Sequence, residues 1–323
     1  TRVATQSEVW AAGYGVLFVL LLASGVAALR QLRPVTTAAE THEVRAELSW
    51  LERVRWIGLA FIPSSLLVGA TTHITTDVAA APFLWVPPLT LYLLTFVFVF
   101  AKKPVISQSV VLRFHPVVMA AVALMLPRVI NLGWGLELGF TLVGLFWASM
   151  TCHGLLAARR PHVSRLTEFY LLMSLGGVLG GAFNALLAPM LFSSVWEYPL
   201  ILAASLMVLP GKSLPLDRRA RLILVMVLSG VCASVILKGL GRHPGELTTT
   251  LLVASAVLGL VLARQRPLVM AACFGAAVFI GTVLDPIAGG KSERGFFGIV
   301  RVLESDGRRA MMHGTTLHGA QLL

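Results

Sequence analysis

The sequence predicts an all-α polytopic membrane protein of about ten transmembrane helices, followed by a short C-terminal β-hairpin segment. Of its 323 residues, 57% are hydrophobic and only 13% are charged, about half of the roughly 25% of charged residues that soluble domains carry. The mean hydropathy of +0.83 agrees with this composition. Too little polar surface remains to cover a water-soluble fold, so the composition excludes a soluble enzyme, a disordered chain and a secreted disulfide module.

Ten apolar runs carry the prediction, because a spanning helix needs about 20 apolar residues. The runs are continuous and exceed the roughly 10-residue alternating segments of a transmembrane β-barrel. The second run contains Pro63, and the seventh carries Glu197 near its start. In chain order the runs are 9–29, 56–76, 83–101, 114–131, 136–157, 168–190, 193–210, 220–238, 247–263 and 267–285.

Basic residues in the connecting loops predict which side each loop faces, since cytoplasmic loops are enriched in Lys and Arg. Over alternate loops, 17 basic residues fall on one side of the ten predicted crossings and three on the other. We therefore expect the basic side to be cytoplasmic and both ends of the chain to lie outside. The same loops explain the net charge of +11 without nucleic acid as a partner; the expected partner is the lipid bilayer.

The tail changes character, and we predict a boundary between a membrane domain at 1–290 and a soluble segment at 291–323. A β-rich run starting at Phe296 and Phe297 is followed by Asp306 and Gly307, a hairpin turn signal. Because a lone hairpin is marginally stable in water, it must pair with another segment or pack on the membrane domain. The chain begins with Thr1, so we expect it to be a fragment of a longer polypeptide.

Polar residues within apolar spans are the first functional candidates, because they are costly in the acyl core. His73 and Asp77 share a helix face at i and i+4, and Asn184 and Glu197 are expected at a similar depth in the outer half. If the four converge, they form an outer polar pocket. The His/Asp pair could bind a metal, relay a proton or hold a cation. Two ligands are fewer than a metal site needs, so we favour a polar helix cap, in which Asp77 binds backbone N–H groups at the start of the next helix.

A second polar pair is expected at the cytoplasmic side, where His153 ends the fifth run and Glu168 opens the sixth. A short loop separates them, so they could pair with each other. The alternative is helix capping, in which Thr167 caps the helix and Glu168 stabilises its positive N-terminus.

Four glycines in the sixth run form two interleaved GxxxG patterns, Gly176 with Gly180 and Gly177 with Gly181. Such patterns let another helix backbone approach closely, so we interpret them as helix-packing residues. The alternative is a smooth transport path.

The three cysteines lie in apolar runs with no metal-ligand spacing, which predicts small buried hydrophobic side chains. No catalytic motif, metal site or cofactor site is expected in this chain. The cysteines are Cys152, Cys232 and Cys273.

Three blocks of sequence resemble one bacterial family. They are FIPSSLLVGATTHITTDVAAAPFLWVPPLTLYLLTF at 61–96, CHGLLAARRPHVSRLTEFYLLMSLGGVLGGAFNALLAPMLFSSVWEYPL at 152–200, and RGFFGIVRVLESDGRRAMMHGTTLHGAQ at 294–321. They resemble integral-membrane spermidine-synthase-like proteins, in which a polytopic region, often described as MFS-like, precedes an aminopropyltransferase-type domain. The resemblance implies a bacterial inner membrane and a polyamine-related role.

The resemblance also implies that the tail begins the synthase-like domain. Gln321, in the stretch His318-Gly319-Ala320-Gln321, is the substrate-side residue that it carries over. The family's nucleoside loop and catalytic Asp have no counterpart in these 323 residues, so this chain is not expected to be catalytic by itself. Two further hypotheses concern the helical region: a transporter-like domain for a small solute or cation, and a structural subunit that packs into a larger membrane assembly through its Gly-rich helix.

Overall fold

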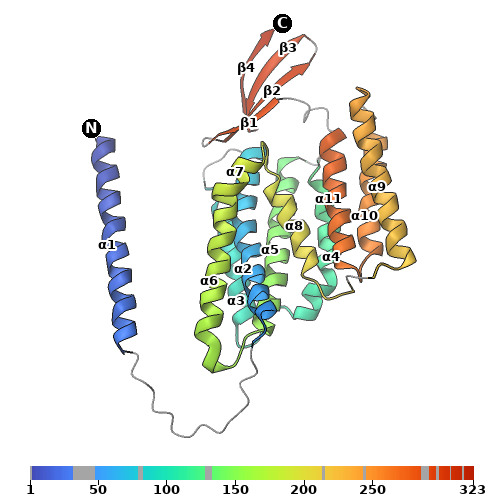
Figure 1. The fold of residues 1–323 in the computed structure, drawn as a ribbon. Coiled ribbons are helices and arrows are strands. Elements are labelled where there is room, and N and C mark those ends of the chain that lie inside the picture. The colour runs from blue at the N-terminus through green and yellow to red at the C-terminus, as the bar shows by residue number, and fades with distance from the viewer. Residues whose placement is uncertain are drawn as a thin grey trace. The chain divides into compact units, whose positions relative to one another are not determined.

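The computed structural model is mainly helical and ends in a small antiparallel sheet (Figure 1). The chain divides into two compact units, Thr1–Leu48 and Ser49–Leu323, which are described separately below. The structure describes residues 2–31, 48–78, 83–127, 133–212, 215–242, 245–284, 291–295, 298–305, 307–314 and 316–323.

In the first unit the described residues form one helix, α1, at Arg2–Gln31. Its stretch Ser7–Ala27 is apolar and long enough to span a membrane. Its Leu, Val and Phe side chains lie on every face of the helix, a pattern compatible with a membrane span.

The second unit contains the remaining helices. The first of them, α2, continues through the π-helical segment η1, and α6 continues through the π-helical segment η3. The elements are α2 Trp50–His73, η1 Ile74–Val78, α3 Val86–Phe100, α4 Gln108–Met125, α5 Trp134–Ala158, η2 Val163–Arg165, α6 Leu166–Ala182, η3 Phe183–Leu187, α7 Ala188–Leu191, α8 Glu197–Met207, α9 Arg218–Gly239, α10 Glu246–Leu262 and α11 Pro267–Leu284.

Among the described residues, seven helical segments are long and apolar enough to cross a membrane, fewer than the ten crossings expected. The predicted runs at 83–101, 193–210 and 247–263 form the shorter apolar helices α3, α8 and α10. The shortest, α8, has 11 residues. At 1.5 Å per residue it rises about 16 Å, roughly half of a 30 Å hydrocarbon core.

Helix α2 packs closely against α6 through one of the two glycine pairs. A Cβ atom at Gly176 would overlap the Ile57 carbonyl oxygen, and one at Gly180 would overlap the Phe61 carbonyl oxygen. Beside Gly177 and Gly181 the same atom would meet open space. The two predicted GxxxG patterns therefore differ: the Cα atoms of Gly176 and Gly180 face α2, whereas Gly177 meets α2 through its carbonyl oxygen, which accepts a hydrogen bond from the Ser64 hydroxyl at 2.7 Å.

Aromatic and aliphatic side chains fill the core of the bundle. Trp56 on α2 contacts Phe169 on α6 edge to face, with ring centroids 5.1 Å apart, and the α11 side chain of Phe274 is fully buried. Cys152 and Cys273 are buried as expected. Cys232 is exposed, contrary to the prediction, because it lies on the outward face of α9.

The sheet is a four-stranded antiparallel meander in the order β1-β2-β3-β4. The predicted hairpin is its β2–β3 pair, with Val302 opposite Met311 and Gly307 in the turn at a positive φ of 69°. Phe296, Phe297 and Asp306, which carried part of that prediction, lie outside the described residues. The strands are β1 Lys291–Gly295, β2 Gly298–Ser305, β3 Arg308–His313 and β4 Thr316–Leu322.

Candidate functional site: the polar junction between sheet and helices

The predicted His/Asp pair lies at the C-terminal end of α2. His73 Nδ1 is 3.4 Å from Asp77 Oδ2, and both side chains are largely buried. Their backbone is π-helical over Ile74–Val78. Single π-helical turns occur often at functional sites.

Asp77 has a second partner that comes from the sheet. Arg301 on β2 donates from its Nη2 atom to Asp77 Oδ1 at 2.9 Å. One carboxylate thus faces a histidine of its own helix and a guanidinium from a residue 224 positions away. The pairing attaches β2 to the end of α2.

Glu197 forms a more deeply buried ion pair. Arg294 on β1 donates from Nη2 to Glu197 Oε1 at 2.7 Å and from Nη1 to Glu197 Oε2 at 3.0 Å. The Arg294 and Glu197 side chains are only 7% and 1% exposed. Two parallel N–H···O bonds fix both direction and distance, which makes this the most specific contact of β1.

The sheet lies at this end of the helices (Figure 1) and makes two further contacts there. The Ser292 hydroxyl donates to the Ser193 carbonyl oxygen at 2.8 Å. Gly314, at φ +58°, leaves no room for a Cβ atom beside the Thr76 carbonyl oxygen. Ile299 on β2 is buried. We call the end of the helices that contacts the sheet the sheet end.

His73 and Tyr198 connect the two ion pairs. Their rings stack with centroids 5.1 Å apart and planes 16° from parallel. Tyr198 directly follows Glu197 and donates its buried hydroxyl to the Thr141 carbonyl oxygen at 3.0 Å. The stack therefore joins α2, α5 and α8 in one arrangement beneath the sheet.

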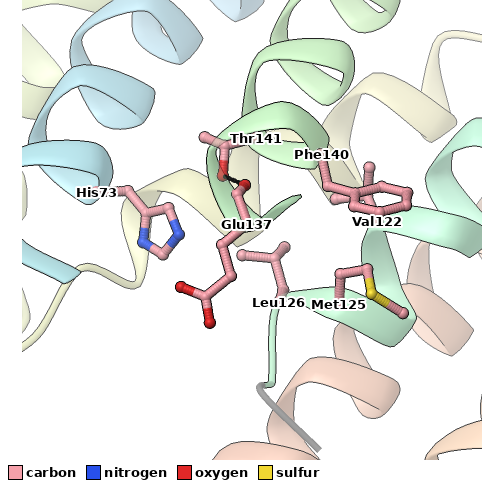
Figure 2. A pocket seen from close by; sticks show the side chains of 7 residues that line it. All are labelled: His73, Val122, Met125, Leu126, Glu137, Phe140 and Thr141. Atoms are coloured by element: carbon pink, nitrogen blue, oxygen red, sulfur yellow. Dashed lines mark hydrogen bonds between the residues drawn. The ribbon is translucent and has the colours of Figure 1, made fainter. Parts of the chain in front are cut away.

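Two small cavities adjoin His73. The larger, about 100 Å³, is lined by His73, Asp77, Trp196 and Arg301 among others. The smaller, about 10 Å³, holds about one water molecule. Figure 2 shows it between the His73 ring and Glu137 in the first turn of α5, with Thr141 bonded back to the Glu137 carbonyl oxygen. Both are below the roughly 300–1,000 Å³ of typical small-molecule sites.

Asn184 does not join this junction. Its amide donates to the Ser65 hydroxyl and, at 3.2 Å, to the Gly180 carbonyl oxygen. It therefore ties η3 to the middle of α2 beside the glycine contact. Of the four residues predicted for an outer pocket, His73, Asp77 and Glu197 lie at the sheet end around the Tyr198 stack.

The predicted inner pair is not formed. His153 lies 2.8 Å from the Thr95 hydroxyl through Nδ1, and its ring is 3.9 Å from the Phe96 ring. Glu168 instead binds Arg53 at 2.5 Å. His153 points toward α3 and Glu168 toward the start of α2, so the short loop between α5 and α6 does not bring them together. Thr167 is not the N-cap either, because α6 begins one residue before it.

Sequence reasoning missed a buried histidine in the core. His115 on α4 lies 3.1 Å from the Thr151 hydroxyl on α5 and 3.1 Å from the Ser205 hydroxyl on α8. In the sequence, these three residues are isolated polar positions in separate apolar runs. Their proximity depends on how the helices pack, which the sequence does not reveal.

The arginine partners of Asp77 and Glu197 were also missed, although the sequence contained evidence for them. Asp77 and Glu197 were expected on the same side as the tail, and the tail contains Arg294 and Arg301. Carboxylates at the apolar ends of helices require counter-charges, so these arginines were candidates.

Gln321, the residue implied by the family resemblance, lies on β4 opposite Arg309 and is exposed. Among the described residues, no group of three or more His, Cys, Asp or Glu side chains is placed to hold a metal ion. Comparisons with protein-family models, with curated proteins and with solved structures found no match to this chain.

Proposed function

We propose that the helices of Ser49–Leu323 form a membrane anchor that holds the β1–β4 sheet in a fixed position at one membrane surface. The buried Arg294–Glu197 ion pair carries this proposal. Removing one partner of such a pair costs about 3–5 kcal/mol, because the other charge is left buried and alone. A sheet that only floated beside the helices would not keep its arginines in that position.

The site favours anchoring over transport of a small cation. Arg294 and Arg301 each neutralise one of the carboxylates that such a cation would use. The 100 Å³ cavity is also too small for an organic solute of ordinary size. The transporter and structural-subunit hypotheses have no comparable observation in their favour.

We further propose that α3, α8 and α10 complete ten crossings, with the sheet end outside the cytoplasm. At the opposite end, Glu52 of α2 binds Arg159 after α5, and Arg53 binds Glu168 of α6. The start of α2 and the end of α5 therefore lie together, which supports an even number of crossings between them and so the inclusion of α3. We call it the basic end, and its Lys and Arg content supports a cytoplasmic location.

The family proposal concerns what the sheet belongs to. We propose that β1–β4 begin a spermidine-synthase-like domain that the helices anchor at a bacterial inner membrane. The antiparallel meander after the last helix supports this order. The edge strand β4 supports it too: every residue of β4 is exposed, and an uncovered edge strand is open to pairing with a further segment of the domain. The test is an aminopropyl-transfer assay of the longest natural reading frame with putrescine; no transfer to any amine contradicts the enzymatic part.

A disulfide cross-link tests the anchor directly. In a variant without the three native cysteines, Ser193→Cys and Ser292→Cys should cross-link rapidly under mild oxidation, because the Ser292 hydroxyl contacts the Ser193 carbonyl oxygen. Ser193→Cys with Thr316→Cys, on exposed β4, is the matched control and should react slowly. Equal rates for both pairs would show that the sheet is not held in place.

Sidedness has its own test. In the same background, a membrane-impermeant maleimide added to intact cells should label Thr316→Cys in the sheet and leave Lys103→Cys, in the loop after α3, unlabelled. Labelling of Lys103→Cys alone would reverse the orientation. Labelling of both without cell lysis would contradict the ten crossings.

A further inference from the structure

A cavity of about 420 Å³ lies at the basic end, bounded by the start of α9, the turn between α10 and α11, and the residues Lys212 and Asp217 before α9. Its volume falls within the roughly 300–1,000 Å³ of small-molecule sites. Four cationic side chains and one acidic side chain line it. They are Lys212, Arg219, Arg264, Arg266 and Asp217.

Two of the four cations form the walls of this cavity. Arg264 donates to the Arg113 carbonyl oxygen at the start of α4. Arg266 donates to the Pro215 carbonyl oxygen at 2.8 Å and lies 3.2 Å from Asp217 Oδ2. These bonds tie three separate segments together, so the cavity is built by the fold and is not a gap between loose loops.

The other two cations, Lys212 and Arg219, are exposed. Among the described residues, neither side chain has a carboxylate partner, and Asp217 is already bound to Arg266. Four positive charges and one negative charge leave a net charge of +3 around the cavity. Like charges held together repel each other, and a bound anion removes that repulsion.

The remaining lining is apolar and distinguishes among anions. Ile223 is buried, whereas Val261 and Leu262, on the last turn of α10, are exposed. A free inorganic anion would not contact these exposed apolar side chains. A phospholipid would fit both the charged and the apolar lining, with its phosphate among the cations and its glycerol and acyl chains along α10.

We propose that this cavity binds the phosphate group of an anionic membrane phospholipid, held by Lys212 and Arg219 against the fixed Arg264 and Arg266. The proposal rests on the membrane placement of the helices and is independent of the role of the sheet. Basic pockets between transmembrane helices near the cytoplasmic surface suit such headgroups.

The test is native mass spectrometry of the full chain, released from detergent containing equal amounts of phosphatidylglycerol and phosphatidylcholine. The wild type should retain phosphatidylglycerol preferentially. The double variant Lys212→Gln/Arg219→Gln should bind it roughly tenfold or more weakly, since each cation near the surface contributes to attraction. Both side chains are exposed, so the variant should unfold at the wild-type temperature.

The control is Lys238→Gln/Arg242→Gln, which removes two charges from the other end of α9 and should leave lipid binding unchanged. Equal loss in both variants would show that only net charge matters and would overturn the proposal. So would displacement of the lipid by excess inorganic phosphate, which would identify a site for a free anion. Failure of the sheet cross-link with lipid binding intact would reject the anchor proposal alone.

Discussion

The two ends of the helical bundle both contain ion pairs, but they use them differently. At the sheet end, Glu197 and Arg294 are almost completely removed from solvent and meet through two hydrogen bonds. At the basic end, Arg53 and Glu168 remain 31% and 33% exposed. A buried pair fixes its partners because losing either leaves an unpaired charge, whereas an exposed pair exchanges for water at little cost.

This difference in burial indicates which end of the bundle has a single fixed set of side-chain contacts. The sheet end joins segments far apart in sequence through specific, buried partners. The basic end joins its loops through exposed partners and keeps surplus positive charge around a cavity. The first suits permanent attachment of a domain, and the second suits contact with a charged surface.

The largest expected effect comes from Glu197→Gln, which leaves the Arg294 guanidinium buried without a counter-charge. We expect a loss of about 3–5 kcal/mol in the free energy of unfolding. Denaturant titration in detergent, followed by fluorescence, measures this loss, and the Ser193/Ser292 cross-link should slow in the same variant.

Adding Arg294→Gln to Glu197→Gln provides the control. The double variant has no buried unpaired charge, so its stability should recover part of the loss. If Glu197→Gln alone is as stable as the wild type, the sheet and helices do not depend on this pair, and the contrast between the two ends disappears.

Two adjacent glycines of α6 give the next largest effect. In Gly176→Ala the new methyl group overlaps the Ile57 carbonyl oxygen, so α2 and α6 must separate. Overpacking of this kind costs about 1–3 kcal/mol. Gly177→Ala makes the same chemical change one residue later, where there is open space.

Thermal unfolding of the two alanine variants separates close packing from backbone effects. Gly177→Ala should be neutral or slightly stabilising, because alanine favours helix over glycine. If Gly177→Ala is the more damaging change, its face of α6 packs against something else, as a second copy in a membrane assembly would.

The sequence predicts the helical elements well and the polar contacts poorly. Continuous apolar runs locate α2, α5, α6, α9 and α11, because hydrophobic length is a local property. The His73–Asp77 pair is local too, since one helix turn sets its spacing. Arg301 pairs with Asp77 from 224 residues away, and no periodicity encodes such a contact.

The failed inner pair follows the same rule. His153 and Glu168 are close in sequence, but they leave the loop on helices that present them to different neighbours, α3 and the start of α2. Proximity along the chain does not decide which way a side chain points. The short helix α8 was also overestimated, because the run at 193–210 includes the non-helical residues 193–196.

A small effect is expected for Glu168→Gln at the basic end. Its half-buried pair with Arg53 is open to solvent screening and should contribute about 1 kcal/mol or less. The contribution should also decrease as salt is raised, because exposed charges are screened. Measuring the unfolding of Glu168→Gln and Glu197→Gln at low and high salt gives a matched comparison. If Glu168→Gln loses more than about 2 kcal/mol of unfolding free energy independently of salt, the Glu168–Arg53 pair behaves like a buried pair and the contrast between the two ends fails.

The smallest effect concerns Asp217, the N-cap of α9. The backbone N–H of Ala220 lowers the pKa of this carboxyl, and Arg266 lowers it further. The folded-state pKa is therefore below that of the unfolded chain, so the carboxylate stabilises the fold above about pH 4 and loses this effect as the pH falls through the folded value. Asp217→Asn keeps the cap but does not titrate.

Acid unfolding curves should show this titration as a stability difference between wild type and Asp217→Asn that is constant near neutral pH and decreases below about pH 4. In an Arg266→Gln background the decrease should be smaller and should end at a higher pH, because without the guanidinium the folded-state pKa of Asp217 lies closer to that of the unfolded chain. A difference that stays constant down to the lowest pH at which the protein folds would mean that the Asp217 carboxylate is not bound to α9 in the folded protein.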